Sequence, residues 1–259
     1  MKKIIYLFIG IFSLQQFFPC LLKAEESQDQ AYAERSQSGS RFFFSDLPKH
    51  LAYDMKESFW GWGGLAFLLG TGLSVGLTKT DHNLQSKFQP NDLLGSKANT
   101  VLSTAGSPYV WGGASLVVTA VGAGIHDEKL LTTGESLLET FFWTQSLSLG
   151  LKYAVGRDRP NGDSRGFPSA HTSASFGSAA VLQSMYGYKA GIPAYLFSSL
   201  VAVSRVDSYH HFLSDVLMGA TLGTVIGYGT AKYHKKLHNF SLTPQISPNE
   251  YGMLFQSSF

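Results

Sequence analysis

Long apolar stretches, separated by short polar segments, dominate the sequence beyond residue 58. Each stretch is longer than an ordinary strand, and none alternates apolar and polar residues over its length, so the pattern predicts helices. The segment from Gly106 to Gly113, which contains a proline, predicts that one stretch begins or kinks near its middle. We therefore expect an all-α fold, a bundle of about six core helices. The stretches are Phe59–Thr78, Ala98–Ile125, Ser136–Val155, His171–Tyr188, Ala190–Ser204 and Phe212–Ala231.

The N-terminal part of the chain does not share this pattern. Two lysines precede an apolar core from Ile4 to Leu14, and Ala24 offers a small residue at a plausible cleavage point. This is the layout of a secretory signal peptide over residues 1–24, with an uncleaved membrane anchor as the alternative. Residues 25–57 are polar, and we interpret them as a loose lead-in followed by a short surface helix.

The C-terminal residues differ again. Tyr251, Met253 and Phe255 fall on alternate positions, which favours a short strand or a hairpin. We therefore expect a short C-terminal β tail over residues 240–259. The apolar stretches and the polar segments between them fall within residues 58–239, which we treat as one catalytic domain.

Composition restricts the classes of partner and cofactor. The formal net charge is +2, so the chain lacks the strongly basic surface that is typical of nucleic-acid binding. Cys20 is the only cysteine, and it lies within the predicted signal peptide. A cleaved chain would therefore have neither a disulfide nor a cysteine-based metal site.

The first of three notable polar segments follows the third apolar stretch. Lys152 lies at the end of that stretch, and Gly156 and Pro160 make a helix unlikely to continue past it. The intervening loop returns Arg157 and Arg159 towards Lys152. Cations gathered at one helix end favour an anion, although cations at a helix C-terminus are also typical of ordinary capping.

The second polar segment spans residues 166–175 and precedes an apolar helix. Ser169 follows a proline and is the expected N-cap of that helix. His171 then lies in the first helical turn, where backbone N–H groups point outward and can hold an anion. Taken alone, a histidine in this position is more often structural than catalytic.

The third polar segment reads SRVDSYHHFLSDV, residues 204–216. His211 and Asp215 are four positions apart, so on a helix they would share a face and could touch. His210 is five positions from Asp215 and diverges around the helix. A carboxylate bonded to one ring nitrogen fixes the tautomer and favours reaction at the other, so His211 is the predicted reactive histidine.

Together these segments read Lys-x6-Arg-Pro, Pro-Ser-Ala-His and Ser-Arg-x5-His-x3-Asp, in that order. The set resembles the type 2 phosphatidic acid phosphatase and vanadium haloperoxidase superfamily, whose core would cover about residues 58–239. The second motif commonly has glycine where this chain has Ala170. If the backbone N–H at this position binds phosphate, alanine can still supply it.

The resemblance implies a role for each matching residue. His211 would attack phosphorus, Asp215 would orient it, and His171 would protonate the leaving group. The residues that would hold the phosphoryl oxygens are Lys152, Arg159, Ser169, Ala170 and Arg205. This scheme requires no metal or other cofactor. The same pocket in this superfamily can hold vanadate, so a haloperoxidase is a further alternative.

The apolar helices favour a phosphorylated lipid or a polyprenyl diphosphate as substrate, and a bilayer as a partner. A soluble periplasmic acid phosphatase acting on small phosphoesters is the alternative. Six full spans after a cleaved signal peptide would turn the site towards the cytoplasm. Lys232, Lys235 and Lys236 instead indicate that their end of the bundle is cytoplasmic and the site external. We expect a cell-envelope protein, either inner-membrane-associated with a periplasmic site or soluble in the periplasm; the sequence leaves its oligomeric state open.

Overall fold

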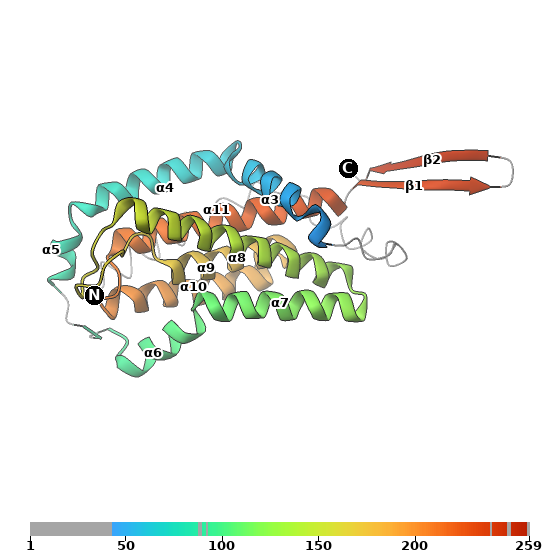
Figure 1. The fold of residues 1–259 in the computed structure, drawn as a ribbon. Helices are drawn as coiled ribbons and strands as arrows, with labels where there is room; N and C mark the ends of the chain where they lie inside the picture. Colours follow the sequence, from blue (N-terminus) through green and yellow to red (C-terminus); the bar gives the residue numbers. More distant parts are fainter. Residues whose placement is uncertain (1–42, 88–89, 92, 239, 248–249, 258–259) are drawn as a thin grey trace.

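The computed structural model describes residues 43–87, 90–91, 93–238, 240–247 and 250–257. The predicted signal peptide lies outside these residues. Within them the chain forms the helices and strands labelled in Figure 1. The elements are α3 (Phe43–Phe59), α4 (Trp62–Thr78), α5 (Asp81–Gln85), α6 (Ser96–Ala105), α7 (Pro108–Ile125), α8 (Glu128–Val155), α9 (Ala170–Tyr186), α10 (Tyr188–Asp207), α11 (Leu213–His238), β1 (Phe240–Ser247) and β2 (Glu250–Ser257).

The prediction of a helical bundle is confirmed for this part of the chain, and the helix ends have local causes. The second apolar stretch divides into α6 and α7, because the Ser107 side chain accepts a hydrogen bond from the Val110 N–H at 3.3 Å and Pro108 opens the new helix. Helix α8 begins well before the expected Ser136. Asp127 caps it by accepting a hydrogen bond from the Leu130 N–H at 2.8 Å.

Helix α9 lies inside the bundle and packs against α8, α10 and α11 (Figure 1). Glycines set its close approach to α11: a Cβ added at Gly223 would overlap the carbonyl oxygen of Ser173, and one at Gly227 would overlap that of Gly177. Small residues at a helix interface let two backbones touch. The contact therefore fixes the starts of both helices relative to each other.

The interior of the bundle holds many small hydroxyl side chains beside its apolar core, and many large apolar side chains are exposed on its surface. Thr144 is fully buried and donates to the Thr140 carbonyl at 2.8 Å, and the hydroxyls of Ser148 and Ser173 join α8 to α9 at 3.1 Å. In contrast, Leu68 of α4 is 69% exposed and Leu116 of α7 is 61% exposed. Apolar surface on this scale is typical of contact with a membrane or a partner.

Among the described residues, α7 is long and apolar enough to cross a membrane. The segments Leu51–Phe59 and Trp62–Thr78 pass the same test together, although they are bent by 70° where they meet. The described part of the chain thus holds one candidate span, or two if the bent pair is counted as one span. This number is smaller than the six apolar stretches in the sequence would allow.

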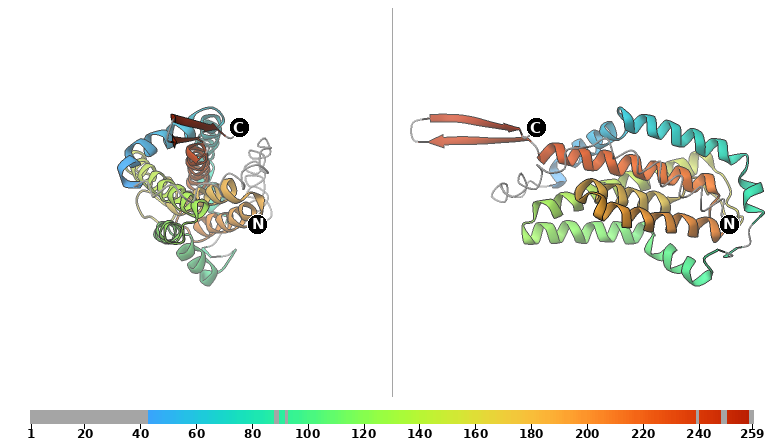
Figure 2. Two further views of the ribbon diagram at one scale, coloured as in Figure 1. Left: turned by 90° about the vertical axis from the view of Figure 1, so that its right-hand side faces the viewer. Right: turned by 180° about the vertical axis from the view of Figure 1, so that it is seen from behind.

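The C-terminal strands form an antiparallel hairpin. Phe240 pairs with Ser257 at its open end and Ser247 pairs with Glu250 beside the turn. Figure 2 shows, from two further directions, that the hairpin continues beyond the end of α11 and extends away from the helices. The β tail is therefore spatially remote from the opposite end of α11, where the polar segments lie.

Candidate active site

The three polar segments meet at one end of the bundle. Helix α8 ends there at Val155 and α10 ends there at Asp207, while α9 begins there at Ala170 and α11 at Leu213. Figure 1 shows these four ends on the side of the molecule that carries α5. The expectation that each polar segment lies at a helix end is confirmed, and all three point to one region.

Lys152 lies in the last turn of α8, which ends at Gly156 in a left-handed conformation with φ 62°. Glycine adopts this conformation without strain, which lets the chain turn back over the helix end. The ammonium group of Lys152 donates to the carbonyl of Arg165 in that loop at 2.8 Å. Burial, assisted by the nearby Arg159 charge, lowers the pKa of Lys152 to about 8.

Arg159 and Arg205 bring further cationic groups to this end. Arg205 is only 4% exposed and donates from Nη1 to the Ser103 hydroxyl at 2.6 Å. Burial, with Arg159 nearby, lowers the pKa of Arg205 to about 10. The Nε atoms of both arginines are buried and find no acceptor among the described residues. Buried donors without acceptors are available to bind an anion.

Ser169 caps α9, as the sequence predicts. Its hydroxyl accepts hydrogen bonds from the Thr172 hydroxyl at 3.0 Å and, more weakly, from the Thr172 N–H at 3.5 Å. Its own N–H donates to the Asp215 carbonyl at 3.0 Å, which ties the start of α9 to the start of α11. Ala170 is the first residue of α9, so it belongs to a helix N-terminus that faces the cations.

His211 and Asp215 approach each other, but not in the way the spacing suggested. Helix α11 begins at Leu213, so His211 precedes the helix and the two residues share no helical face. The pair is brought together by the helix cap, because the Asp215 carboxylate accepts the Phe212 N–H at 2.9 Å. Nδ1 of His211 lies 3.6 Å from Oδ2 of Asp215, which is an ion-pair distance and too long for a hydrogen bond.

The His211 ring is 2% exposed. Burial, followed by the charges of Lys152 and Arg205, lowers its pKa well below the ordinary value. The ring is therefore neutral near pH 7, which is the form that can act as a nucleophile. Burial also raises the pKa of Asp215, against the opposing effects of the Phe212 N–H and Arg157.

Arg157 supports Asp215 rather than joining the other cations. Its guanidinium donates to Asp215 at 3.1 Å, to the Ser214 hydroxyl at 2.6 Å and to Asp81 at 2.7 Å. Asp81 lies on α5 and also accepts from the N–H and hydroxyl of Ser214. The guanidinium lies 4.3 Å from the centre of the Phe212 ring. Sequence reasoning missed Asp81, whose partner is distant along the chain.

Two further histidines from the polar segments, His171 and His210, lie at this end of the bundle. His171 lies in the first turn of α9, and burial, followed by the charges of Arg205 and His211, lowers its pKa to about 3. A bound dianion would offset those cations and raise this pKa again. Nδ1 of His210 and the Ser208 hydroxyl are joined by a hydrogen bond of 2.9 Å, and burial followed by the charge of Arg205 lowers the pKa of His210.

The charges at this end favour an anionic ligand. The buried carboxylates Asp81 and Asp215 both receive hydrogen bonds from Arg157. The remaining cations Lys152, Arg159 and Arg205 have no buried carboxylate of their own among the ion pairs of the described residues. The arrangement is therefore suited to a phosphate-like group beside a neutral, buried imidazole.

Comparison with known proteins agrees with this class. The PAP2 superfamily profile matches residues 161–239, which include the second and third polar segments. The matched residues make up less than half of the chain, and within them the match agrees with the family resemblance that the motifs indicated.

Similar proteins include the lipid A 1-phosphatase of Porphyromonas gingivalis, which is 35% identical over 80 residues, covering 29% of this chain and 18% of that protein. The lipid A 4'-phosphatase of Helicobacter pylori is 31% identical over 93 residues, covering 34% of this chain and 44% of that protein. The chain thus spans less than half the length of these relatives. The solved transmembrane PAP2-type phosphatidylglycerolphosphate phosphatase of Bacillus subtilis matches 63% of this chain and 96% of its own, at 20% identity with a TM-score of 0.36.

Proposed function

We propose that this protein is a PAP2-type phosphatase that hydrolyses a lipid phosphate through a phosphohistidine intermediate. The observation that carries the proposal is the placement of a neutral, buried His211 among cations from separate helix ends. A transferring phosphoryl group spreads its charge over its outer oxygens, which fixed cations stabilise. The catalytic domain is residues 58–239 in this proposal.

In the first step, Nε2 of His211 attacks phosphorus and the bond from phosphorus to the leaving alkoxide breaks. Nδ1 faces Asp215, which leaves Nε2 as the reacting atom. His171 takes up a proton once the bound phosphate offsets the neighbouring cations, and it passes this proton to the alkoxide. In the second step, His171 removes a proton from water. The resulting hydroxide attacks phosphorus, the P–N bond breaks, and phosphate leaves.

The phosphoryl oxygens are held by the side chains of Lys152, Arg159 and Arg205 in this scheme. Ser169 and Ala170 contribute the N-terminus of α9, whose partial positive charge favours an anion. Arg205 supports this role because its Nε is buried without an acceptor among the described residues. The reaction takes all of its proton transfers and charge stabilisation from these side chains.

The surface of α8 supports an amphiphilic substrate. Phe142, Leu149 and Tyr153 are 46%, 56% and 61% exposed, and their spacing of seven and four positions places them on one side of the helix. This apolar side ends one residue beyond Lys152, beside the phosphate site. A lipid could rest its chains there while its phosphate reaches the cations. The similarity to two lipid A phosphatases makes lipid A the first substrate to test.

We also propose that the protein is associated with the inner membrane, with its phosphate site facing the periplasm. Lys232 and Lys235 lie near the opposite end of α11 from that site. Basic residues are enriched at the cytoplasmic ends of membrane segments. The candidate spans in α7 and in the α3–α4 pair support membrane association.

The experiment is a comparison of substrates with protein purified in detergent. Lipid A, phosphatidic acid and p-nitrophenyl phosphate are assayed for phosphate release, with and without EDTA and with orthovanadate. We expect lipid phosphates to be preferred, vanadate to inhibit, and EDTA to leave initial rates unchanged at a temperature well below unfolding. Preference for p-nitrophenyl phosphate without detergent would instead support a soluble acid phosphatase. Activity lost in EDTA and restored only by a divalent ion would contradict the mechanism.

A further inference from the structure

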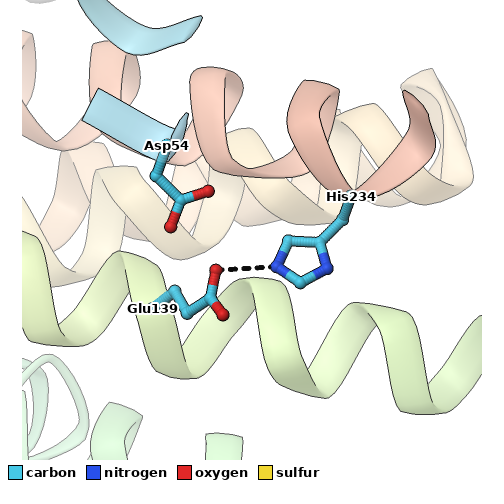
Figure 3. Close-up of side chains that lie close together, drawn as sticks. All are labelled: Asp54, Glu139 and His234. Atoms are coloured by element: carbon cyan, nitrogen blue, oxygen red, sulfur yellow. Dashed lines mark hydrogen bonds and ion pairs between the residues drawn. The ribbon is translucent and has the colours of Figure 1, made fainter. Parts of the chain in front are cut away.

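A second cluster of ionisable side chains lies inside the bundle, away from the phosphate site. Asp54 of α3, Glu139 of α8 and His234 of α11 are 0%, 1% and 1% exposed. Figure 3 shows their side chains pointing towards one another from three helices. Nε2 of His234 and Oε2 of Glu139 are 2.7 Å apart, and one ligating atom from each residue lies within 4.8 Å of the others.

The environment of Asp54 is what makes this cluster unusual. Both of its carboxylate oxygens are buried, and neither accepts a hydrogen bond from the described residues. Figure 3 shows the carboxylate directed at Glu139 and His234. A buried carboxylate without a donor or a counter-charge is strongly unfavourable, and a second carboxylate beside it adds repulsion. A bound cation would relieve this cost, as would a proton shared between Asp54 and Glu139.

The packing of α3 shows that Asp54 is held in this position. One turn further along the same helix, Glu57 forms an ion pair with Lys232 at 3.1 Å. Ser58 donates to the Ile226 carbonyl at 3.4 Å, and a Cβ added at Gly229 would overlap the Ser58 side chain. Helix α3 is therefore packed tightly on α11 beside Asp54, which keeps the carboxylate inside the bundle.

We propose that Asp54, Glu139 and His234 bind a divalent transition-metal ion, with Zn²⁺ as the best match. One imidazole nitrogen and two carboxylate oxygens are donors that Zn²⁺ accepts in proteins, whereas Ca²⁺ and Mg²⁺ prefer oxygen donors alone. Donor atoms around a tetrahedral Zn²⁺ lie roughly 3.4 Å apart, so small side-chain rotations would bring these three into range. The ion supplies the positive charge that the buried carboxylates require.

This metal site is separate from the phosphatase chemistry. Asp215 and His234 are nineteen positions apart on α11, which corresponds to roughly 28 Å along the helix axis. The ion joins α3 to α8 and α11, so its effect is on the stability of the bundle. The inference therefore goes beyond the proposed function and does not depend on it.

The first test is metal content and thermal unfolding of the full chain in detergent. After purification without chelator, elemental analysis is expected to find about one Zn²⁺ per chain in the wild type. Asp54→Asn should lose most of this metal, whereas Glu57→Gln, a carboxylate change on the same helix outside the cluster, should retain it. Stripping the wild type with a chelator should lower its unfolding temperature, and adding Zn²⁺ at a hundredfold excess over Kd should restore it by about 5 °C.

The second test needs no folded variant, because it titrates the stripped wild type with Zn²⁺ and with Mn²⁺ by calorimetry. Saturable Zn²⁺ binding near one equivalent that raises the unfolding temperature supports the site. The alternative is a proton shared between the two carboxylates. In that case neither Zn²⁺ nor Mn²⁺ would shift the unfolding of the stripped wild type, and this result would overturn the proposal.

Discussion

Helix α11 joins two clusters of ionisable side chains with opposite excess charge. At its N-terminal end, Lys152, Arg159 and Arg205 exceed the carboxylates available to pair with them. Near its C-terminal end, two carboxylates lie beside one histidine, and Asp54 accepts no hydrogen bond from the described residues. The first cluster is partly buried and the second is fully buried, and their charge imbalances have opposite signs.

In this protein, a cluster of charged side chains without enough oppositely charged partners indicates the sign of the charge of its ligand. Structural charges in this protein are neutralised internally, as Arg157 shows by bonding to both Asp81 and Asp215. The excess cations near the N-terminal end of α11 indicate an anionic ligand. The excess carboxylates near the C-terminal end indicate a cationic ligand.

Removing one of the cations near the N-terminal end of α11 should have a large effect. Arg205→Ala is expected to lower kcat/KM by roughly 10²- to 10³-fold, because a fixed donor to the transferring phosphoryl group is lost. Arg205→Lys keeps a charge but not the guanidinium geometry, so it should recover only part of this loss. Steady-state kinetics on a lipid phosphate check both variants. A change below threefold in Arg205→Ala would remove Arg205 from the phosphate site.

Weakening an internally neutralised pair should have a smaller effect. Asp81→Asn removes one acceptor of Arg157, which lets the arginine shift and loosens the support of Asp215. We expect kcat to fall by about tenfold with KM little changed, since Asp81 acts through positioning rather than substrate contact. Asp163→Asn, which alters the exposed pair with Arg159, is the matched control and should be near wild type. Equal losses in both variants would contradict the positioning role.

The charge of Lys152 should be visible in the pH dependence of anion binding. Its pKa is lowered to about 8, so its ammonium loses its proton as pH rises through that value and the attraction for anions falls. Inhibition by vanadate is therefore expected to weaken above pH 8. Lys152→Arg keeps its charge throughout this range and should lose that step. A wild-type step that persists unchanged in Lys152→Arg would assign it to another group.

The smallest effect is expected from the C-terminal hairpin. It extends away from the helices, beyond the end of α11 opposite the phosphate site (Figure 2). Deleting residues 241–259 should leave turnover within about twofold of the intact chain, because the deleted backbone is remote from the reacting groups. The deleted protein is assayed for phosphate release and for thermal unfolding. A deleted chain that folds but is inactive would place the tail in the site.

The sequence predicts the phosphate site well because its residues lie at helix ends, which short sequence patterns indicate. Ser169 caps a helix, Gly156 ends one, and the motif residues lie at helix ends where a short pattern can place them. The predicted reason for the contact between His211 and Asp215 was wrong, because α11 begins at Leu213, after His211, and a helix cap rather than a shared helical face brings the two residues together.

Contacts between distant segments were not predictable in the same way. Asp81 meets Arg157 because α5 packs beside the loop after α8, and no spacing in the chain signals this contact. Asp54, Glu139 and His234 come from three helices whose relative rotation is set by packing. Neighbouring glycines such as Gly229 hint at close helix approach, but they do not indicate which helix lies opposite.

The most direct test of the central claim is to trap phosphate on His211. Protein mixed with ³²P-labelled substrate and denatured within milliseconds under alkaline conditions should carry acid-labile phosphate, because a phosphohistidine is stable to base and labile to acid. We predict labelling of the wild type and of His210→Ala, and none of His211→Ala, whose turnover should fall by roughly 10³-fold or more. Labelled His211→Ala, or unlabelled wild type that still turns over in a pre-steady-state burst, would contradict the account.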